Sequence, residues 1–239
     1  MINQENTFET RIRFKFYKKD EFKYLSHLDI IRIIVRALSR AGMEIKYSHG
    51  YSPKPKINFS PPTPLGVVSL AEYADVLLDG GVEENEFKKM VNLKLKPQIQ
   101  ITEAKKIIIK ADNLMNDIAI SLYCFKLCAS SSGENLLKEF YMDIDEKLRV
   151  KSDFSRSIFD LKIKQDKEIS EIILLKLFGY AKIFKEENNE FFKFNNFYKF
   201  LENWLKKYKI NIKGVEKEEL FAVRGNALKT PIEVILVKQ

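Results

Sequence analysis

The stretch RIRFKFY, residues 11–17, alternates between polar and apolar side chains along its length. Because successive residues of a β-strand point to opposite faces of a sheet, this period of two predicts a strand. Ile12, Phe14 and Phe16 would then face a core. A polar turn, KKDE, follows the strand. This strand is therefore the first predicted element of the fold.

A helix is predicted directly after this turn. Ser26 is a typical N-cap, Asp29 follows three residues later as in a variant of the capping box, and Gly42 is a stop signal. Apolar residues at helical spacing would face the core. On the other side, arginines recur every four residues and form a stripe, which consists of Arg32, Arg36 and Arg40.

The next segments complete a βαββαβ order over residues 1–110. The predicted strands are MEIKY (43–47) with INF (57–59), EYADVLLD (72–79) and IQITEAKKIII (99–109), and the second helix is VEENEFKKMVNLKL (82–95). This order is typical of the ferredoxin-like, or split βαβ, fold. We therefore predict an α+β domain with an antiparallel sheet.

Residues 118–239 show a similar succession without any residue-level repeat, and 110–117 is the predicted linker. The predicted elements are a strand at 120–129, a helix at 134–142, a strand at 147–151 (KLRVK), a hairpin at 157–165 and 171–180, a helix at 195–208, and strands at 220–225 and 231–237 (PIEVILV). The prediction for the whole chain is two tandem ferredoxin-like domains, at 1–110 and 118–239.

Composition indicates a folded protein outside the membrane. Of the 239 residues, 45% are hydrophobic and 12% aromatic, which is enough for a core. No apolar run approaches the roughly 20 residues that cross a bilayer, and the polar start MINQENTFETRIR lacks the apolar segment of a signal peptide. We expect a cytoplasmic protein without a membrane partner. Cys124 and Cys128 are expected to be buried structural thiols.

The net charge of +8 is concentrated near the N-terminus. Residues 1–60 hold 12 basic and 6 acidic residues, whereas the other 179 residues hold 29 and 27. Five of the eight arginines precede residue 41, and the planar guanidinium fork suits phosphate. The distribution favours a local basic surface that binds a polyanion such as RNA.

The segment YSHGYSPKPK, residues 47–56, is a second candidate binding element. Glycine permits a sharp turn at positive φ, and the two prolines stiffen the backbone, which lowers the cost of ordering it on a partner. The tyrosines can stack on bases or pack on the sheet. The candidate binding residues are Tyr47, His49, Gly50, Tyr51, Lys54 and Lys56. A rigid structural connection is the alternative.

His27 is the candidate catalytic residue. It falls at the first helical position, where amides without intrahelical partners can hold an anion, and a histidine can act as acid or base near neutral pH. Tyr24 and Ser26 beside it are candidate binding residues, and packing of His27 at the core edge is the alternative. We expect the helix start and the 47–56 segment to converge in one cationic pocket.

Two histidines without a supporting ligand cluster make a poor metal site, so we expect no metal. The sequence contains neither a glycine-rich phosphate loop nor a G-x-S-x-G elbow. We therefore expect no cofactor.

Several of these blocks together resemble the radical SAM-linked protein family, a bacterial family built around a domain of unknown function. The matching blocks are YLSHLD (24–29), Arg40-Ala41-Gly42, the 47–56 segment, Leu65-Gly66, and Glu72-Tyr73 with Asp75. The chain departs from the pattern at His49 and Ser52, where the family has Gln and Asn. The departure at His49 counts against a catalytic role for it.

The resemblance implies a gene beside, or fused to, one for a radical SAM protein. Because the chain has two cysteines, it cannot supply the three-cysteine cluster motif, so that chemistry would belong to a partner. We expect a non-catalytic accessory protein that binds tRNA or rRNA and presents it to a radical SAM partner. One alternative is a metal-independent endoribonuclease resembling CRISPR RNA-processing enzymes, with His27 as base and Tyr24 or Lys56 assisting. Another is an interaction scaffold with an incidental basic patch.

Overall fold

The computed structural model describes residues 9–109, 113–129, 134–150, 154–165, 172–181 and 191–234. Over these residues the chain is a mixed α+β protein with five α-helices and antiparallel strand pairing, which confirms the predicted class. The chain divides into two compact units, Met1–Ile118 with Ala222–Gln239, and Ala119–Phe221. The C-terminal segment, assigned from sequence to the second domain, is thus grouped with the first. Within the described residues, no helix combines the length and apolarity needed to span a membrane.

The first unit contains a sheet with strand order β4-β1-β3-β2. Its elements are β1 (Glu9–Lys18), the 3-10 helix η1 (Asp20–Tyr24), α1 (His27–Arg40), β2 (Ile57–Phe59), β3 (Val68–Asp79), α2 (Glu84–Asn92), β4 (Ile99–Ile107), α3 (Leu114–Asp117) and β9 (Ala227–Lys229). Instead of the predicted strand at 43–47, the structure has two isolated bridges, Ile45 to Leu78 and Tyr47 to Pro55.

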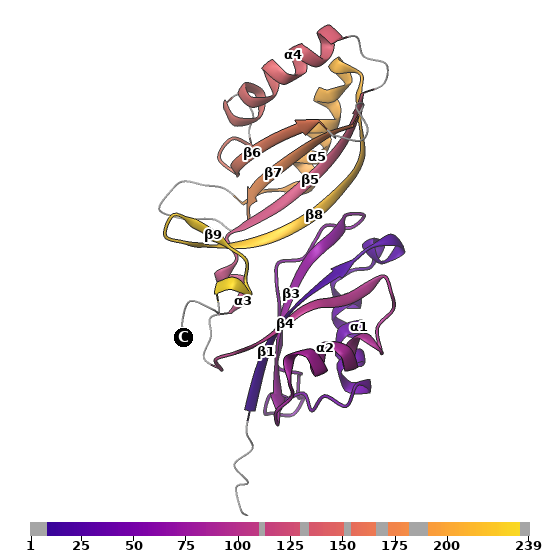
Figure 1. Ribbon diagram of the computed structural model, residues 1–239, viewed down its shortest axis with the longest axis vertical. Helices are drawn as coiled ribbons and strands as arrows, with labels where there is room; N and C mark the ends of the chain where they lie inside the picture. The colour runs from indigo at the N-terminus through magenta and orange to yellow at the C-terminus, as the bar shows by residue number, and fades with distance from the viewer. Residues whose placement is uncertain are drawn as a thin grey trace, which may run out of the picture. The chain divides into compact units, whose positions relative to one another are not determined.

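Both helices α1 and α2 cover one face of this sheet (Figure 1). The alternating residues Ile12, Phe14 and Phe16 are fully buried against them, as the period of two predicts. The boundaries of α1 also agree with the prediction: the hydroxyl of Ser26 accepts a hydrogen bond from the Asp29 amide at 3.2 Å. At the other end Gly42 adopts a φ of +77°, which glycine tolerates without strain.

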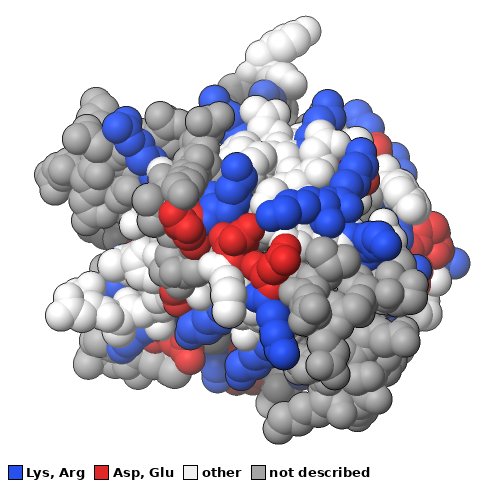
Figure 2. Space-filling view, turned by 90° about the horizontal axis from the view of Figure 1, so that it is seen from above, with Lys and Arg blue, Asp and Glu red and all other residues white. Residues whose placement is uncertain are grey.

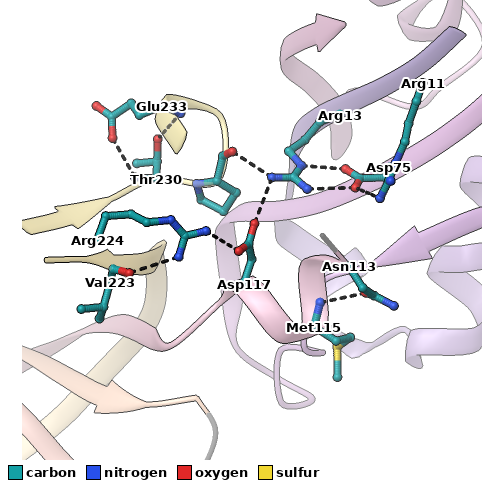
Figure 3. A network of polar contacts seen from close by, with 11 residues as sticks. Arg11, Arg13, Asp75, Asn113, Met115, Asp117, Val223, Arg224, Thr230 and Glu233 are labelled. Atoms are coloured by element: carbon teal, nitrogen blue, oxygen red, sulfur yellow. Dashed lines mark hydrogen bonds and ion pairs between the residues drawn. The ribbon is translucent and has the colours of Figure 1, made fainter. Parts of the chain in front are cut away.

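The other face of β1 carries a buried network of charges (Figure 3). Arg13, only 1% exposed, donates through Nε to Asp75 Oδ1 at 2.7 Å and through Nη1 to the Pro231 carbonyl at 3.0 Å. Arg11 donates to the same carboxylate at 2.7 Å. Asp117 lies 3.8 Å from Arg13 and also pairs with Arg224. Buried charges are tolerated because each has such partners.

The predicted strand PIEVILV is wrong over residues 231–234, and the rest of it lies outside the described residues. Thr230 and Glu233 form a reciprocal capping box: the Glu233 amide donates to Thr230 Oγ1 at 3.3 Å, and the Thr230 amide donates to Glu233 Oε2 at 2.7 Å. Pro231 at the first position fits a helical turn. The turn buries Ile232 and Val234.

The second unit repeats the order of elements and strands, with sheet order β8-β5-β7-β6. Its elements are β5 (Ile120–Ala129), α4 (Glu134–Asp145), the π-helical turn η2 (Glu146–Val150), β6 (Ile158–Gln165), β7 (Ile172–Tyr180), α5 (Phe194–Leu205), the 3-10 turn η3 (Lys206–Tyr208) and β8 (Ile210–Arg224) as far as Phe221. The hairpin of β6 and β7 is confirmed. An aromatic core joins Phe125 of β5 to Phe197 of α5.

The predicted strand KLRVK is wrong, because the chain continues α4 as a π-helical turn over Glu146–Val150. Leu148 is fully buried and extends the helical spacing of Phe140 and Ile144, both buried, by four more residues. A core-facing stripe that continues at this spacing favours helix over strand. Residue 151 lies outside the described residues.

The Asp75 network yields a prediction about stability. Asp75→Asn removes the charge that Arg11 and Arg13 neutralise, and breaking a buried ion pair costs about 3–5 kcal/mol. We expect the free energy of unfolding, measured by urea denaturation, to fall by that amount. Glu103→Gln is the control, because Glu103 lies 3.8 Å from Lys15 and is half-exposed, and such surface pairs contribute about 0–1 kcal/mol. Equal losses in the two variants would contradict the buried network.

Cys124 gives a second prediction. Burial, reinforced by the nearby Glu218, raises the pKa of its thiol to about 12. Because the thiolate is the reactive form, iodoacetamide at pH 8 should leave Cys124 unmodified in the native protein and alkylate it in guanidinium chloride. Peptide mass spectrometry measures both states, with the partly exposed Cys128 as internal comparison. Rapid native alkylation of Cys124 would refute the assignment.

Candidate functional site

The arginine stripe of α1 is exposed, but its three members differ. Arg32 Nη1 lies 3.1 Å from Asp29 Oδ1. The Ser26 hydroxyl, donating at 2.6 Å, and the Arg32 guanidinium lower the pKa of Asp29. Asp29 is therefore ionised at neutral pH and offsets the charge of Arg32. Of the three arginines, Arg32 would therefore contribute least to the binding free energy of an anionic ligand.

Arg36 and Arg40, by contrast, line a hollow of about 460 Å³ together with Lys94 and Lys96, which follow α2. We call this the basic hollow. Its other lining residues are mostly apolar: Phe22, Ile33, Val35, Ser39 and Leu95. No acidic side chain is among these lining residues, all of which belong to the described first unit. Such an arrangement can bind an anion that also carries an apolar surface.

The 47–56 segment forms a loop whose two ends are joined by backbone hydrogen bonds. The Ser48 amide donates to the Lys54 carbonyl at 2.8 Å, and the Lys56 amide donates to the Lys46 carbonyl at 2.7 Å. Gly50 has a φ of +122°, in agreement with the predicted turn. The side chains of Tyr47, His49, Tyr51, Lys54 and Lys56 are exposed, Tyr51 fully. The segment is thus rigidly closed at its base and presents its tip to solvent.

His27 occupies the first position of α1, as predicted, and its ring meets that of Phe59 edge-on at 5.8 Å. Phe59 is the last residue of β2, which directly follows the 47–56 segment. Its contact with His27 therefore places the end of β2 beside the start of α1. Tyr24, also exposed, lies under Lys23 and next to Gly66. Neither the basic hollow nor the cavity beside His27 is lined by residues 47–56. The expected single pocket is therefore divided among three places.

The cavity beside His27 brings together polar residues that sequence reasoning missed. It holds only about 10 Å³ and is lined by Lys18, Thr63 and Glu72 among apolar neighbours. Lys18 is 3% and Glu72 5% exposed. The Thr63 hydroxyl donates a hydrogen bond to Glu72 Oε1. A cavity of this size has room for about one water molecule at most, so the cluster can hold a proton donor or acceptor but not a nucleotide.

The sequence did contain a signal for this cluster. In β1 the core-facing series Ile12, Phe14, Phe16 continues at Lys18, and in β3 the core-facing alternation from Leu78 back through Val76 and Ala74 ends at Glu72. A lysine and a carboxylate at core-facing positions must be paired, because burying an isolated charge is costly.

Another face of the described residues offers less to an anion. Figure 2 shows a face on which Lys and Arg side chains surround a group of Asp and Glu side chains. The electrostatic potentials of such mixed charges largely cancel beyond the Debye length, the distance over which dissolved salt screens a charge. Within the described residues, no group of three or more His, Cys, Asp or Glu side chains has a metal-binding arrangement.

Comparison with known proteins identifies a family but no activity. A family model described as "Uncharacterized protein conserved in bacteria (DUF2344)" matches residues 11–177. No curated protein matches the chain.

Three similar solved structures share low identity with this chain. An unknown protein from Galdieria sulphuraria is 10% identical, with a TM-score of 0.26, and the match covers 88% of this chain and 99% of that one. A putative glycine cleavage system transcriptional repressor is 8% identical, with a TM-score of 0.25 and the same coverage. An encapsulated DyP-type peroxidase from Mycobacterium smegmatis is 9% identical, with a TM-score of 0.19, covering 75% and 86%. At these TM-scores the likenesses carry no argument about function.

The cavity beside His27 yields a prediction. Thr63→Val keeps the shape of the side chain and removes the hydroxyl that donates to Glu72. Since a hydrogen bond to a charged group contributes about 1.5–3 kcal/mol, the free energy of unfolding should fall by that amount in urea denaturation. Thr102→Val is the matched control, because this threonine is exposed and its hydroxyl bond is long, at 3.3 Å. If Thr63→Val is as stable as the control, the buried carboxylate does not depend on Thr63.

Proposed function

The chain belongs to the DUF2344 family of uncharacterised bacterial proteins, and we propose that it is an accessory protein that binds RNA on the exposed side of α1. The observation that carries this proposal is the basic hollow, which Arg36, Arg40, Lys94 and Lys96 line together with mostly apolar residues and no acidic residue. We call its apolar lining residues the apolar floor; they are Phe22, Ile33, Val35 and Leu95. Arginine forks and lysine ammonium groups are the usual partners of phosphate oxygens.

The 47–56 segment provides a second, separate RNA contact in the proposal. Tyr51 is fully exposed and provides a ring on which a base can stack, and Lys54 and Lys56 beside it can contact the phosphates on either side. Tyr47 and His49 are exposed in the same segment. Because the hydrogen bonds at its base already fix the backbone, little ordering entropy is lost on binding.

The resemblance to the radical SAM-linked family extends the proposal to a partner. We propose that this cytoplasmic protein presents its RNA, a tRNA or rRNA, to a radical SAM enzyme that supplies the chemistry. The shared order of elements and strands in the two units supports a tandem ferredoxin-like architecture as its scaffold.

A second candidate function is a metal-independent endoribonuclease. The observation that favours it is the position of His27 at a helix start beside the buried Lys18 and Glu72, since a histidine near other titratable groups can serve as general base. Metal-free RNA cleavage that His27→Ala abolishes would support it. RNA that stays intact after long incubation in EDTA would refute it. A scaffold with an incidental basic patch predicts no RNA binding at all.

The RNA proposal predicts how affinity responds to salt and to single substitutions. We expect the affinity for single-stranded RNA, measured by fluorescence anisotropy, to fall steeply between about 50 and 200 mM salt. Arg36→Ala should weaken binding and reduce the slope of log K against log salt by about one phosphate contact, or roughly 0.7 for a single strand.

Arg32→Ala is the control in the same stripe. Because Asp29 already offsets the charge of Arg32, its removal should change the affinity and the slope much less. Equal effects of the two substitutions would mean that RNA does not use the basic hollow, and salt-independent binding would argue against a phosphate-mediated interface.

A further inference from the structure

The walls of the basic hollow are unsuited to a bare phosphate. Sites built for phosphate alone surround it with N–H and O–H donors, whereas this floor is formed by Phe22, Ile33, Val35 and Leu95. The one hydroxyl in the lining, that of Ser39, donates to the Val35 carbonyl of its own helix at 3.1 Å. The apolar floor therefore fits a flat, weakly polar group, and the cations fit the charge attached to it.

The size of the hollow supports the same conclusion. A phosphate group displaces a few water molecules, each of which occupies about 30 Å³. The volume of about 460 Å³ is several times larger and falls within the range of about 300–1,000 Å³ typical of small-molecule sites. The hollow thus has room for a base and a sugar as well as a phosphate.

The four cations that line the basic hollow lie close enough together to favour the binding of an anion among them. Arg40 Nη2 donates to the Lys94 carbonyl at 2.9 Å, which holds its guanidinium between α1 and the segment after α2. Arg36 and Arg40 are four residues apart on α1, and like charges at this spacing repel each other. Lys94 and Lys96 add two more positive charges. An anionic ligand would relieve this repulsion.

Building on the RNA-binding function proposed above, we infer that the basic hollow receives a single nucleotide of an unpaired RNA strand, with its base on the apolar floor and its phosphate against Arg36 and Arg40. The floor offers no polar side chain to read the edges of a base, so the site binds by stacking and apolar contact and accepts all four bases. A double helix does not fit this description, because its bases are paired and stacked on one another.

Isothermal titration with simple probes tests the inference. AMP carries both the base and the phosphate, adenosine lacks the phosphate, and inorganic phosphate lacks the base. At about 50 mM salt we expect AMP to bind at least tenfold more tightly than either of the others, and UMP to bind within about fivefold of AMP. Equal affinities for AMP and inorganic phosphate would overturn the inference.

A substitution that fills the basic hollow with a large side chain gives the decisive test. Ser39 is exposed and lines the hollow, so Ser39→Trp occupies the space while leaving all four cations in place. We expect it to weaken AMP at least tenfold and inorganic phosphate less than twofold. Leu93→Trp, which adds the same ring at an exposed position outside the lining of the hollow, is the control and should bind AMP normally. AMP binding that survives Ser39→Trp would overturn the inference.

The same variants separate this inference from the RNA-binding function on which it rests. A single-stranded RNA that binds through Arg36, yet with the same affinity in Ser39→Trp, would leave the RNA-binding function standing and remove the nucleotide pocket. If the wild-type protein binds no RNA at low salt, both the RNA-binding function and the nucleotide pocket are refuted.

Discussion

Strand β1 has a neighbouring strand on each side and is covered on both of its faces, and the first unit depends on this constraint. Its apolar side chains pack under α1 and α2. Its arginines point the other way: Arg13 is buried and Arg11 is partly buried, so both need partners. Asp75 on β3 accepts from both Arg11 and Arg13, and the carbonyl of Pro231 accepts from Arg13 across 218 residues of sequence. The chain's C-terminal segment is thus held in the same unit as its N-terminal strand.

This constraint changes how the N-terminal charge is understood. Five arginines precede residue 41, but they do not form one surface. Arg11 and Arg13 neutralise a buried carboxylate, and Arg32 is offset by Asp29. Arg36 and Arg40 remain for a ligand, where they join Lys94 and Lys96. The functional proposal therefore rests on a small group of cations around an apolar floor and not on net charge.

Two buried carboxylates of β3 lie on opposite faces of the sheet, and both belong to one short segment of sequence. Glu72 and Asp75 are three residues apart, so their side chains point to opposite faces. Glu72 lies in the small cavity with Lys18 and His27, and Asp75 lies among the arginines. Both are nearly inaccessible to solvent. The EYAD segment thus places one carboxylate beside the start of α1 and the other beside Arg13, which donates to the Pro231 carbonyl of the C-terminal segment.

The sequence by itself determined the elements with strong local periodicity: β1, α1 with its Ser26 cap and Gly42 stop, α2, and the β6–β7 hairpin. It also indicated His27 at the helix start and the turn at Gly50. Local patterns suffice there because each depends on neighbours a few residues away. Only the tertiary structure decided that residues 146–150 and 231–234 form helical turns and not strands, because it buries Leu148, Ile232 and Val234. A local signal, the Thr230–Glu233 capping box, agrees with the second turn. The pairing of Arg36 and Arg40 with Lys94 and Lys96 was likewise decided by the fold, because packing of α1 beside the segment after α2 joins residues more than 50 positions apart, and no local pattern records such a contact.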